Sequence, residues 1–391
     1  MEGAALLDLV CGPASPLADT HQRYRLVSHL GSGGQAEVYR AVRVCNGISS
    51  APVTVKVFRM AGDRPPTDQL RSWDKGDAVL MDLNSRGVPG ICRRSDGFYG
   101  PLPAPPGQRA PGDPVPYQVL DYLHGVTLRE YVAQRYGLGG AGPRLDAVAA
   151  LTTLAGVLQA LHQPGDPRAC PVLHMDVKPS NVIVLTGGEV RLIDFTGARY
   201  YWRDHITSVA YTLEAGGPEA FSGNVGPAYD VHGFGAVAYY LVTGAFPRTE
   251  ASPPDGVTAP PWAVLRRHPL LDANPGLREH LLAPVADRPE DRPHTKELSG
   301  WVRRLAELVS ATPRPDVGLD WSGSARIPVA SGLAAAPLTG TETGAFQRIE
   351  KLERELVELR TALGGGVARP SASSAAPTRV AGAATGGSVP G

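Results

Sequence analysis

The most informative part of this chain is the stretch His174-Met175-Asp176-Val177-Lys178-Pro179-Ser180-Asn181. It is followed shortly by Leu192-Ile193-Asp194-Phe195. Together they supply an Asp, a Lys, an Asn and a second Asp in a fixed order. An Asp can orient a hydroxyl nucleophile, a Lys can neutralise a migrating phosphate, and an Asn with an Asp can hold metal ions. This spacing therefore predicts transfer of a phosphoryl group from magnesium-bound ATP.

These two segments resemble the catalytic loop and the metal loop of the eukaryotic-type protein kinases, written H-R-D-L-x-x-x-N and D-F-G in that family. The resemblance implies that Asp176 orients the substrate hydroxyl and accepts its proton, and that Lys178 stabilises the transferred phosphoryl group. It also implies that Asn181 and Asp194 hold Mg²⁺. A Lys at the position of Lys178 is similar to the serine/threonine subclass.

Two upstream segments resemble the phosphate-binding parts of the same family. Leu30 to Val38 reads LGSGGQAEV, similar to the loop G-x-G-x-x-G-x-V, whose glycines let backbone N–H groups approach the phosphates. Val53 to Phe58 resembles the strand V-A-I-K, so Lys56 would grip the α and β phosphates. Only five of the 38 Lys and Arg residues are Lys, and two of these, Lys56 and Lys178, fall on the family's lysine positions.

A third segment, Tyr117 to Gly125, has the pattern of a buried strand that runs into a turn. It resembles the strand and hinge that carry the adenine, although an ordinary core strand explains these residues equally well. On the resemblance, Leu120 is the gatekeeper, and the backbone of Asp121 and Leu123 bonds the adenine edge. The residues that the resemblance places around the nucleotide are Leu30, Gly31, Gly33, Val38, Lys56, Leu120, Asp121 and Leu123.

Downstream residues continue the same order. Thr212 and Gly217-Pro218-Glu219 resemble the end of the activation segment, and Arg292 stands where the family has the partner of that Glu. We therefore expect a buried ion pair between Glu219 and Arg292. Asp230 opens an apolar stretch like the central helix of the large lobe.

The resemblance extends from about Tyr24 to Ser310 and predicts an α+β fold with two lobes, a small β-rich one and a larger helical one. Beyond Thr312 the composition turns to Ala, Gly, Ser, Thr and Pro, which cannot bury enough apolar surface to offset ordering entropy. The predicted parts are a flexible N-terminus over 1–20, a kinase domain over 21–311 with lobes at about 21–121 and 125–311, a disordered linker over 312–344, a short coiled-coil-like helix over 345–364 and a disordered tail over 365–391.

The helix expected over 345–364 has leucines and an isoleucine three and four residues apart, which is the spacing of a coiled-coil seam. A possible homodimer follows from this seam. An amphipathic helix that docks on its own lobe or on another protein has about the same weight, because isolated helices of this length are marginal. The seam residues are Ile349, Leu352, Leu356, Leu359 and Leu363.

Three departures from the family pattern bear on activity. Met175 replaces the Arg of H-R-D and cannot pair with a phosphate in the activation segment, whose hydroxyls are Thr207, Ser208 and Thr212. Thr196 replaces the Gly of D-F-G, which narrows the backbone freedom of that loop.

The third departure concerns the partner of Lys56. With Leu80 and Leu83 on the family's apolar positions, Gly76 occupies the site of the first-helix Glu, and Asp74 and Asp77 are the nearest acids. Either the register slips by one or the ion pair is absent. A missing pair would favour a feeble enzyme or a pseudokinase.

Composition limits the other classes of function. The formal net charge is zero, which gives no electrostatic reason for binding nucleic acid or an anionic membrane. Four scattered cysteines indicate free thiols, a reducing compartment and no zinc site. No apolar run is long enough to span a bilayer or to act as a signal peptide, so we expect a cytoplasmic location. The 46 Gly, 37 Pro and the preference for Arg over Lys suggest a bacterial source of high GC content.

The leading interpretation is a protein serine/threonine kinase with a signalling or regulatory role, which uses ATP and Mg²⁺ and acts on protein substrates. The alternative is a pseudokinase that binds nucleotide or a partner with little or no turnover. Small-molecule kinases of the aminoglycoside type share the two-lobe core but lack the segment from Thr212 to Glu219 and its Arg292 partner, which argues against that class.

Overall fold

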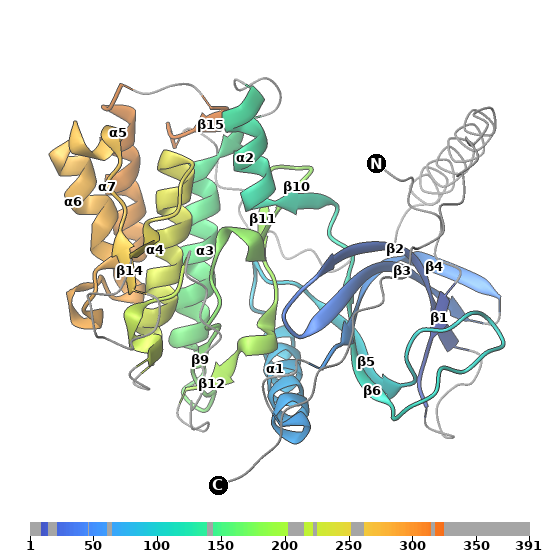
Figure 1. The fold of residues 1–391 in the computed structure, drawn as a ribbon. Coiled ribbons are helices and arrows are strands. Elements are labelled where there is room, and N and C mark those ends of the chain that lie inside the picture. The colour runs from blue at the N-terminus through green and yellow to red at the C-terminus, as the bar shows by residue number, and fades with distance from the viewer. Residues whose placement is uncertain are drawn as a thin grey trace, which may run out of the picture. The chain divides into compact units, whose positions relative to one another are not determined.

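The computed structural model describes residues 9–14, 22–45, 47–60, 65–138, 144–201, 215–221, 225–251, 262–313 and 317–323. All of them belong to one compact unit, Met1–Ile327. The helix expected over 345–364 and the hydroxyls of Thr207, Ser208 and Thr212 lie outside the described residues. The predicted two-lobed fold is confirmed, with a β-sheet in the small lobe and helices in the large one (Figure 1).

The small lobe is built on a six-stranded antiparallel sheet of order β1-β2-β3-β4-β6-β5. Its strands alternate β-branched and polar residues, the pattern of a sheet with one buried face. The register places Lys56 of β4 opposite Val38 of β3 and Gln118 of β6. The strands are β1 Leu9–Cys11, β2 Gln22–Ser32, β3 Ala36–Cys45, β4 Ile48–Phe58, β5 Arg94–Gly100 and β6 Val115–Asp121.

The short strand β1 covers one edge of this sheet and reaches toward the other. Val10 and Ala104 exchange backbone hydrogen bonds of 2.9 and 3.2 Å, and the Ala14 N–H donates to the Tyr99 carbonyl of β5 at 2.9 Å. Inside the sheet, the Phe98 ring is stacked between the rings of Tyr24 and Tyr117. Backbone groups that would otherwise be exposed along the edges are thereby paired.

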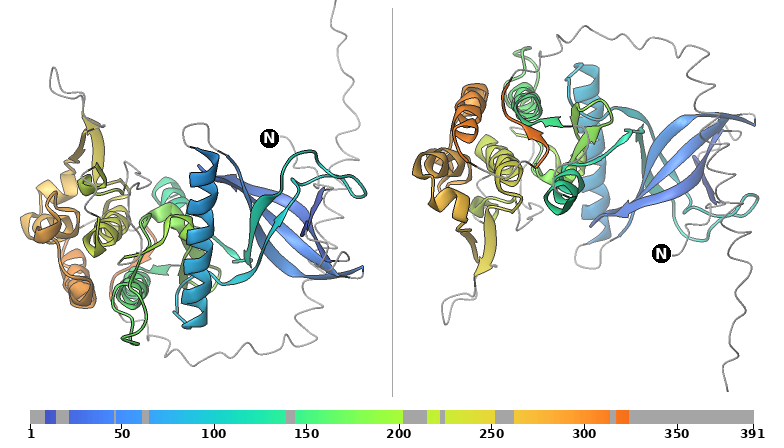
Figure 2. Two further views of the ribbon diagram at one scale, coloured as in Figure 1. Left: turned by 90° about the horizontal axis from the view of Figure 1, so that it is seen from below. Right: turned by 90° about the horizontal axis from the view of Figure 1, so that it is seen from above.

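Helix α1, Pro66–Ser85, stands between the sheet and the large lobe (Figure 2). It begins with a proline, whose fixed φ and missing N–H suit the first helical position. Trp73, Leu80 and Leu83 are buried along one side. The chain leaves the helix through Gly87, whose φ of +68° is the left-handed conformation that glycine adopts without strain.

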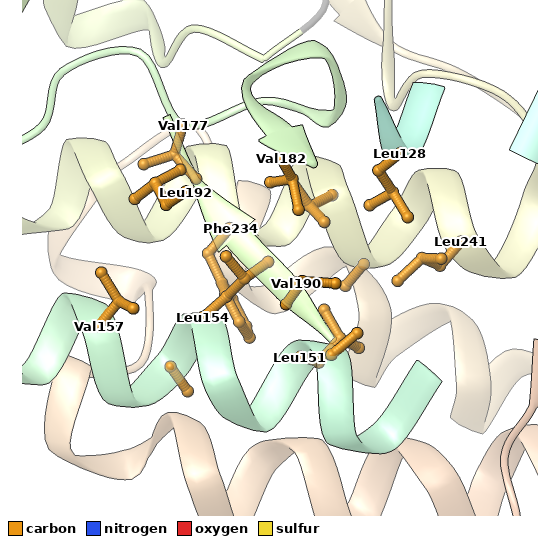
Figure 3. Packing of buried hydrophobic residues seen from close by; sticks show 14 of the residues in the cluster. Leu128, Leu151, Leu154, Val157, Val177, Val182, Val190, Leu192, Phe234 and Leu241 are labelled. Atoms are coloured by element: carbon orange, nitrogen blue, oxygen red, sulfur yellow. The ribbon is translucent and has the colours of Figure 1, made fainter. Parts of the chain in front are cut away.

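The large lobe is a bundle of helices around a core to which α3, α4 and strand β11 contribute (Figure 3). Helix α4 is buried along most of its length, as its apolar sequence predicts. The helices of this lobe are α2 Leu128–Leu138, α3 Ala147–His162, α4 Pro227–Thr243, α5 Pro269–Asp272, α6 Pro275–Leu282 and α7 Leu298–Ser310.

Short strands complete the large lobe and frame its loops. The three-stranded sheet of order β11-β10-β7 and the pair β12-β9 carry the segments that hold the catalytic motifs. These strands are β7 Gly125–Thr127, β8 Leu145–Asp146, β9 Val172–Leu173, β10 Val182–Leu185, β11 Val190–Leu192, β12 Arg199–Tyr200, β13 Arg248–Ala251, β14 Trp262–Leu265 and β15 Leu319–Asp320.

The chain still contacts the large lobe after helix α7. Strand β15 pairs in parallel with β8, and Val317, Leu319 and Trp321 are buried in the core of that lobe. None of the helices in the described part of the chain is both long and apolar enough to cross a membrane.

Candidate active site

The loop between β9 and β10 carries His174 to Asn181, and Asp230 of helix α4 shapes its backbone. The N–H groups of His174 and Met175 donate to the two carboxylate oxygens of Asp230 at 2.8 and 2.7 Å. The His162 ring nitrogen Nε2 lies 2.9 Å from the same carboxylate. Met175 has a φ of +67°, which is costly for a residue other than glycine and persists only where neighbours determine it. Asp230 supplies this constraint.

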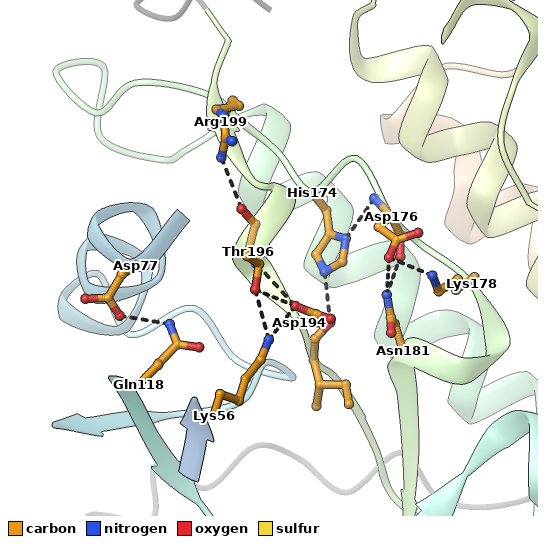
Figure 4. Close-up of polar contacts among 11 residues, drawn as sticks. Lys56, Asp77, Gln118, His174, Asp176, Lys178, Asn181, Asp194, Thr196 and Arg199 are labelled. Carbon is orange, nitrogen blue, oxygen red and sulfur yellow. Dashed lines mark hydrogen bonds and ion pairs between the residues drawn. The ribbon is translucent and has the colours of Figure 1, made fainter. Parts of the chain in front are cut away.

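Asp176, Lys178 and Asn181 are brought together by this loop (Figure 4). The Lys178 Nζ lies 2.8 Å from an Asp176 carboxylate oxygen. The Asn181 side-chain nitrogen donates to the backbone and side-chain oxygens of Asp176, both at 2.8 Å. The amide nitrogen is thus used by Asp176, and the amide oxygen is the atom of Asn181 that could bind a metal ion.

Burial raises the pKa of the Asp176 carboxyl above its usual range, although the neighbouring Lys178 ammonium opposes this rise. A general base works best when its pKa lies near the working pH, so a raised pKa makes a carboxylate a better base at neutral pH. The geometry and the electrostatics of Asp176 therefore agree with the role of a proton acceptor.

The metal loop lies directly beside the catalytic loop. The Ile193 N–H donates to the Asn181 carbonyl at 2.9 Å, and the His174 ring nitrogen Nε2 lies 3.1 Å from the Ile193 carbonyl. Asp194 follows with a φ of +66°, a conformation that turns its side chain out of the strand direction. The two loops are therefore tied together at the residue before Asp194.

Lys56 reaches Asp194 from the sheet of the small lobe. Its Nζ lies 2.6 Å from Asp194 Oδ1, and its side chain is only 7% exposed. Burial by itself would raise the pKa of the Asp194 carboxyl, but the Lys56 ammonium and the Thr196 hydroxyl outweigh burial and hold it well below its usual range. Asp194 is therefore ionised at neutral pH, as a metal ligand must be.

The two candidate acids of helix α1 are engaged elsewhere. Asp77 accepts two hydrogen bonds from the Arg94 guanidinium at 2.6 and 2.8 Å and one from Gln118 at 2.8 Å. Asp74 accepts from the Tyr99 hydroxyl at 2.8 Å. Among the interactions of the described residues, Lys56 thus has no carboxylate partner on helix α1. Of the two alternatives that the sequence leaves open, a shifted register and an absent ion pair, the structure has the second.

Gly76 explains why helix α1 offers no acid at the expected position. A Cβ atom placed on Gly76 would lie 2.5 Å from the Thr196 carbonyl oxygen and 2.6 Å from that of Phe195. Real Cβ atoms essentially never come this close to another heavy atom. The helix therefore packs directly on the backbone of the metal loop, and no side chain fits between them.

The predicted nucleotide-contacting residues occupy neighbouring strands of the small lobe. Gly31 of β2 is opposite Val38 of β3, and Val38 is opposite Lys56 of β4. The Gly33 N–H donates to the Ala36 carbonyl at 2.8 Å, which closes the turn between β2 and β3. Leu30, at the end of this series, is 48% exposed.

The hinge residues lie at the end of β6. Leu120 is buried in the sheet, opposite Thr54 of β4. The Asp121 N–H donates to the Arg93 carbonyl at 2.9 Å, which fixes the backbone at the end of this strand. Leu123 follows and packs, partly buried, on the core of the large lobe. The three predicted residues therefore lie in the segment that joins the lobes.

The donor set fits a magnesium nucleotide. The described residues contain no group of three or more His, Cys, Asp and Glu side chains that could hold a metal ion by themselves. Asp194 and Asn181 offer one carboxylate and one amide oxygen. Mg²⁺ is commonly held in this way, by one or two protein oxygens completed by substrate phosphates and water.

Two residues further along the chain form an ion pair inside the large lobe. Arg292 and Glu219 form a bidentate ion pair, with Nη2 to Oε2 at 2.8 Å, and both side chains are almost wholly buried. The ion pair expected from the sequence is therefore confirmed.

Sequence reasoning missed two residues of this region. The part of Asp230 in fixing the catalytic-loop backbone was not foreseen, although its place at the start of an apolar helix marked it as unusual. The contact of the Thr196 hydroxyl with Lys56, at 2.9 Å, was not foreseen either. The sequence shows Thr196 in place of the Gly of D-F-G, but this substitution by itself indicates only a loss of backbone freedom and not a contact with Lys56.

Comparison with known proteins agrees with this geometry. The sequence profile of the protein kinase domain family matches residues 24–256. The serine/threonine-protein kinase PknL of Mycobacterium tuberculosis (strain CDC 1551 / Oshkosh) is 32% identical over 234 residues, which cover 58% of this chain and 51% of PknL. The serine/threonine-protein kinase PknB of Mycolicibacterium smegmatis is 30% identical over 289 residues, which cover 70% of this chain and 41% of PknB. The chain spans about half the length of the curated relatives it matches.

Proposed function

The chain belongs to the protein kinase family, and we propose that it is an ATP-dependent protein serine/threonine kinase. The observation that carries this proposal is the ion pair of 2.6 Å between Lys56 and Asp194, formed across the two lobes beside a catalytic loop with Asp176 and Lys178 in contact. Phosphoryl transfer depends almost entirely on such positioning and charge stabilisation. The relatives are named serine/threonine-protein kinases, which supports the choice of serine and threonine.

ATP and Mg²⁺ would bind between the sheet and the catalytic loop. Leu30, Val38 and Leu120 would contact the adenine, and Lys56 would bind the α and β phosphates. Asn181 and Asp194 would bind Mg²⁺, which neutralises charge on the phosphates when it is bound. The ionised state of Asp194 supports this assignment.

In the proposed reaction the hydroxyl oxygen of a substrate Ser or Thr forms a bond to the γ phosphorus. The bond between that phosphorus and the β–γ bridging oxygen breaks, and ADP leaves. Asp176 orients the hydroxyl and accepts its proton, and Lys178 stabilises charge on the phosphoryl group during transfer. The close contact of the Asp176 carboxylate with Lys178 and Asn181 keeps it in one orientation.

The biological setting of this activity is also a proposal. We infer a signalling or regulatory role in a bacterium, with protein substrates and a cytoplasmic location. The zero net charge supports the absence of nucleic acid among the partners. A homodimer through 345–364 rests on the apolar seam of that segment alone.

Incubation of the purified chain with radiolabelled ATP, Mg²⁺ and a generic protein substrate tests the proposal. We expect label on Ser and Thr, and loss of transfer of about a thousandfold in Asp176→Asn, since the variant removes the proposed proton acceptor. Circular dichroism on the same variant checks that it is folded. Nucleotide binding without any transfer by the folded wild-type chain would instead identify a pseudokinase.

A further inference from the structure

The ammonium group of Lys56 is held by the metal loop. Its Nζ lies 2.6 Å from Asp194 Oδ1 and donates to the Thr196 hydroxyl at 2.9 Å. Both acceptors belong to the metal loop, whereas Lys56 comes from strand β4 of the small lobe (Figure 4). Within the described residues, helix α1 contributes no carboxylate to this ammonium, because Asp74 and Asp77 bond to other side chains. The helix contacts the ammonium through the Trp73 ring, whose centroid lies 5.8 Å from Nζ, a cation–π contact.

The Thr196 hydroxyl can do what a glycine at this position cannot. It donates to Asp194 Oδ1 at 2.7 Å and accepts from Lys56 at the same time. The three polar groups thus form a closed triangle in which the hydroxyl serves as both donor and acceptor. Bonds to charged groups are shorter and stronger than neutral ones, so the hydroxyl restricts the ammonium and the carboxylate together.

Helix α1 is anchored by hydrogen bonds that do not involve Lys56. Tyr200 donates from its hydroxyl to Asp82 at 2.9 Å, and Arg199 bonds to Ser72. These contacts tie the helix to strand β12 on both sides of Gly76. The middle of the helix is where Gly76 meets the Thr196 carbonyl. The helix therefore stays against the metal loop without an ion pair to the small-lobe lysine.

We propose that Thr196 is a positioning residue for Lys56 and takes over the task that a first-helix carboxylate would otherwise perform. The inference rests on the proposed function, since it concerns how the same site grips Mg-ATP. It follows that the position of Lys56 depends on the conformation of the metal loop itself. The side chains of Asp194 and Lys56 should therefore become ordered together, because the same hydroxyl binds both.

Nucleotide binding measured by calorimetry tests this role without relying on catalysis. The probe is Mg²⁺ with a non-hydrolysable ATP analogue. Thr196→Val removes the hydroxyl at nearly constant volume, and we expect it to weaken binding roughly tenfold or more, as the loss of a bond to a charged group does. Thr196→Ser keeps the hydroxyl and should bind within about threefold of wild type. Equal affinity of the Val variant and wild type would overturn the proposal.

A double-mutant cycle shows whether Thr196 acts through Lys56. If it does, Lys56→Met with Thr196→Val should bind no more weakly than Lys56→Met alone, because the interaction is already lost. Additive losses of affinity would mean that Thr196 supports the fold and not the lysine. Asp77→Asn is the matched control on helix α1, and we expect it to bind the analogue within about twofold of wild type. If Asp77→Asn lost as much affinity for the analogue as Thr196→Val, helix α1 and not Thr196 would be the element that positions Lys56.

The outcomes of the two proposals can be told apart. A wild-type chain that binds the analogue but transfers no phosphate would refute the kinase activity, and the binding cycle would still decide the role of Thr196. Normal transfer by Thr196→Val with unchanged affinity would refute the role of Thr196 and leave the activity standing. Thermal unfolding of each variant verifies that a loss of affinity does not come from unfolding.

Discussion

At the scale of single residues, Met175 is the substitution with the clearest physical consequence. It stands where the family has an Arg, and its side chain is buried with Leu173, Val225 and Tyr229 in a small apolar cluster. An apolar contact with the segment that leads to helix α4 thus occupies the place of a charged group. Such a contact does not depend on an added phosphate.

We therefore predict that phosphatase treatment leaves the transfer rate of this chain within about twofold, because Met175 offers no charge to a phosphate. The measurement compares initial rates before and after treatment, with mass spectrometry to verify that phosphate has been removed. A collapse of the rate in the treated sample would contradict this expectation and point to another phosphate-binding residue.

The carboxylate of Asp230 accepts hydrogen bonds from two backbone N–H groups of the catalytic loop. Burial would raise the pKa of its carboxyl, but the hydrogen bond from His162 and the other contacts lower it below the usual value. A carboxyl whose pKa is lower in the folded state stabilises the protein above its unfolded pKa. That contribution is lost as the pH falls through the folded value.

From this sign we predict that Asp230→Asn lowers the free energy of unfolding by about 1.5–3 kcal/mol near pH 7, the size of a hydrogen bond to a charged group. The difference from wild type should begin to shrink below about pH 4, where the carboxyl of the unfolded chain becomes protonated, and should be lost as the pH falls through the lower folded pKa of Asp230. Urea unfolding at a series of pH values measures it. A difference that stays constant into acid would show that the charge of Asp230 contributes nothing.

At the scale of elements, the contact of helix α1 with the metal loop is set by a missing side chain. Gly76 lets the helix backbone approach the carbonyls of Phe195 and Thr196, and these belong to the backbone and cannot rotate away. The close approach explains why the helix lies where it does without an ion pair to Lys56.

Gly76→Ala should therefore displace helix α1 and destabilise the protein by about 1–3 kcal/mol, the usual cost of overpacking. Gly156→Ala in helix α3 is the matched control, because an added Cβ there meets nothing within 4 Å. In an exposed helix interior the control change should stabilise by about 0.5–1 kcal/mol. Thermal melts of both variants decide the matter, and a neutral Gly76→Ala would show that the helix has room to shift.

At the level of the whole molecule, the prediction of a homodimer depends on the sequence of residues 345–364. The apolar seam from Ile349 to Leu363 remains a prediction, since it lies outside the described residues. A fair truncation must keep Val317, Leu319 and Trp321, which are buried in the large lobe. Removing them would confuse loss of the seam with damage to the core.

We predict that the full chain forms a dimer at roughly tens of micromolar, a concentration suited to a weak pair. A chain that ends at Gly323 should be monomeric, and Leu356→Glu should dissociate the dimer because it places a charge in the seam. Light scattering on the three proteins measures this. A monomeric full chain would leave docking on another surface as the explanation of the seam.

The kinase fold and the ion pair of Glu219 with Arg292 could be predicted from the amino-acid sequence. Each of these predictions depends on local motifs and on their order along the chain, which resemble those of a known family. The position of residues 317–323 was not foreseen, because strand β15 pairs with β8, which is remote in sequence. Strand β1 was not foreseen either, since it is only three residues long and contacts Ala104 as well as β2.

The partners of Lys56 could not be predicted from the sequence and follow from the packing of the folded chain. The choice among Asp74, Asp77 and the metal loop depends on where helix α1 packs, and that depends on Gly76 meeting a backbone more than a hundred residues away. No local pattern encodes such a distance. A hydroxyl at Thr196 becomes a partner for Lys56 only because packing brings the two groups to 2.9 Å.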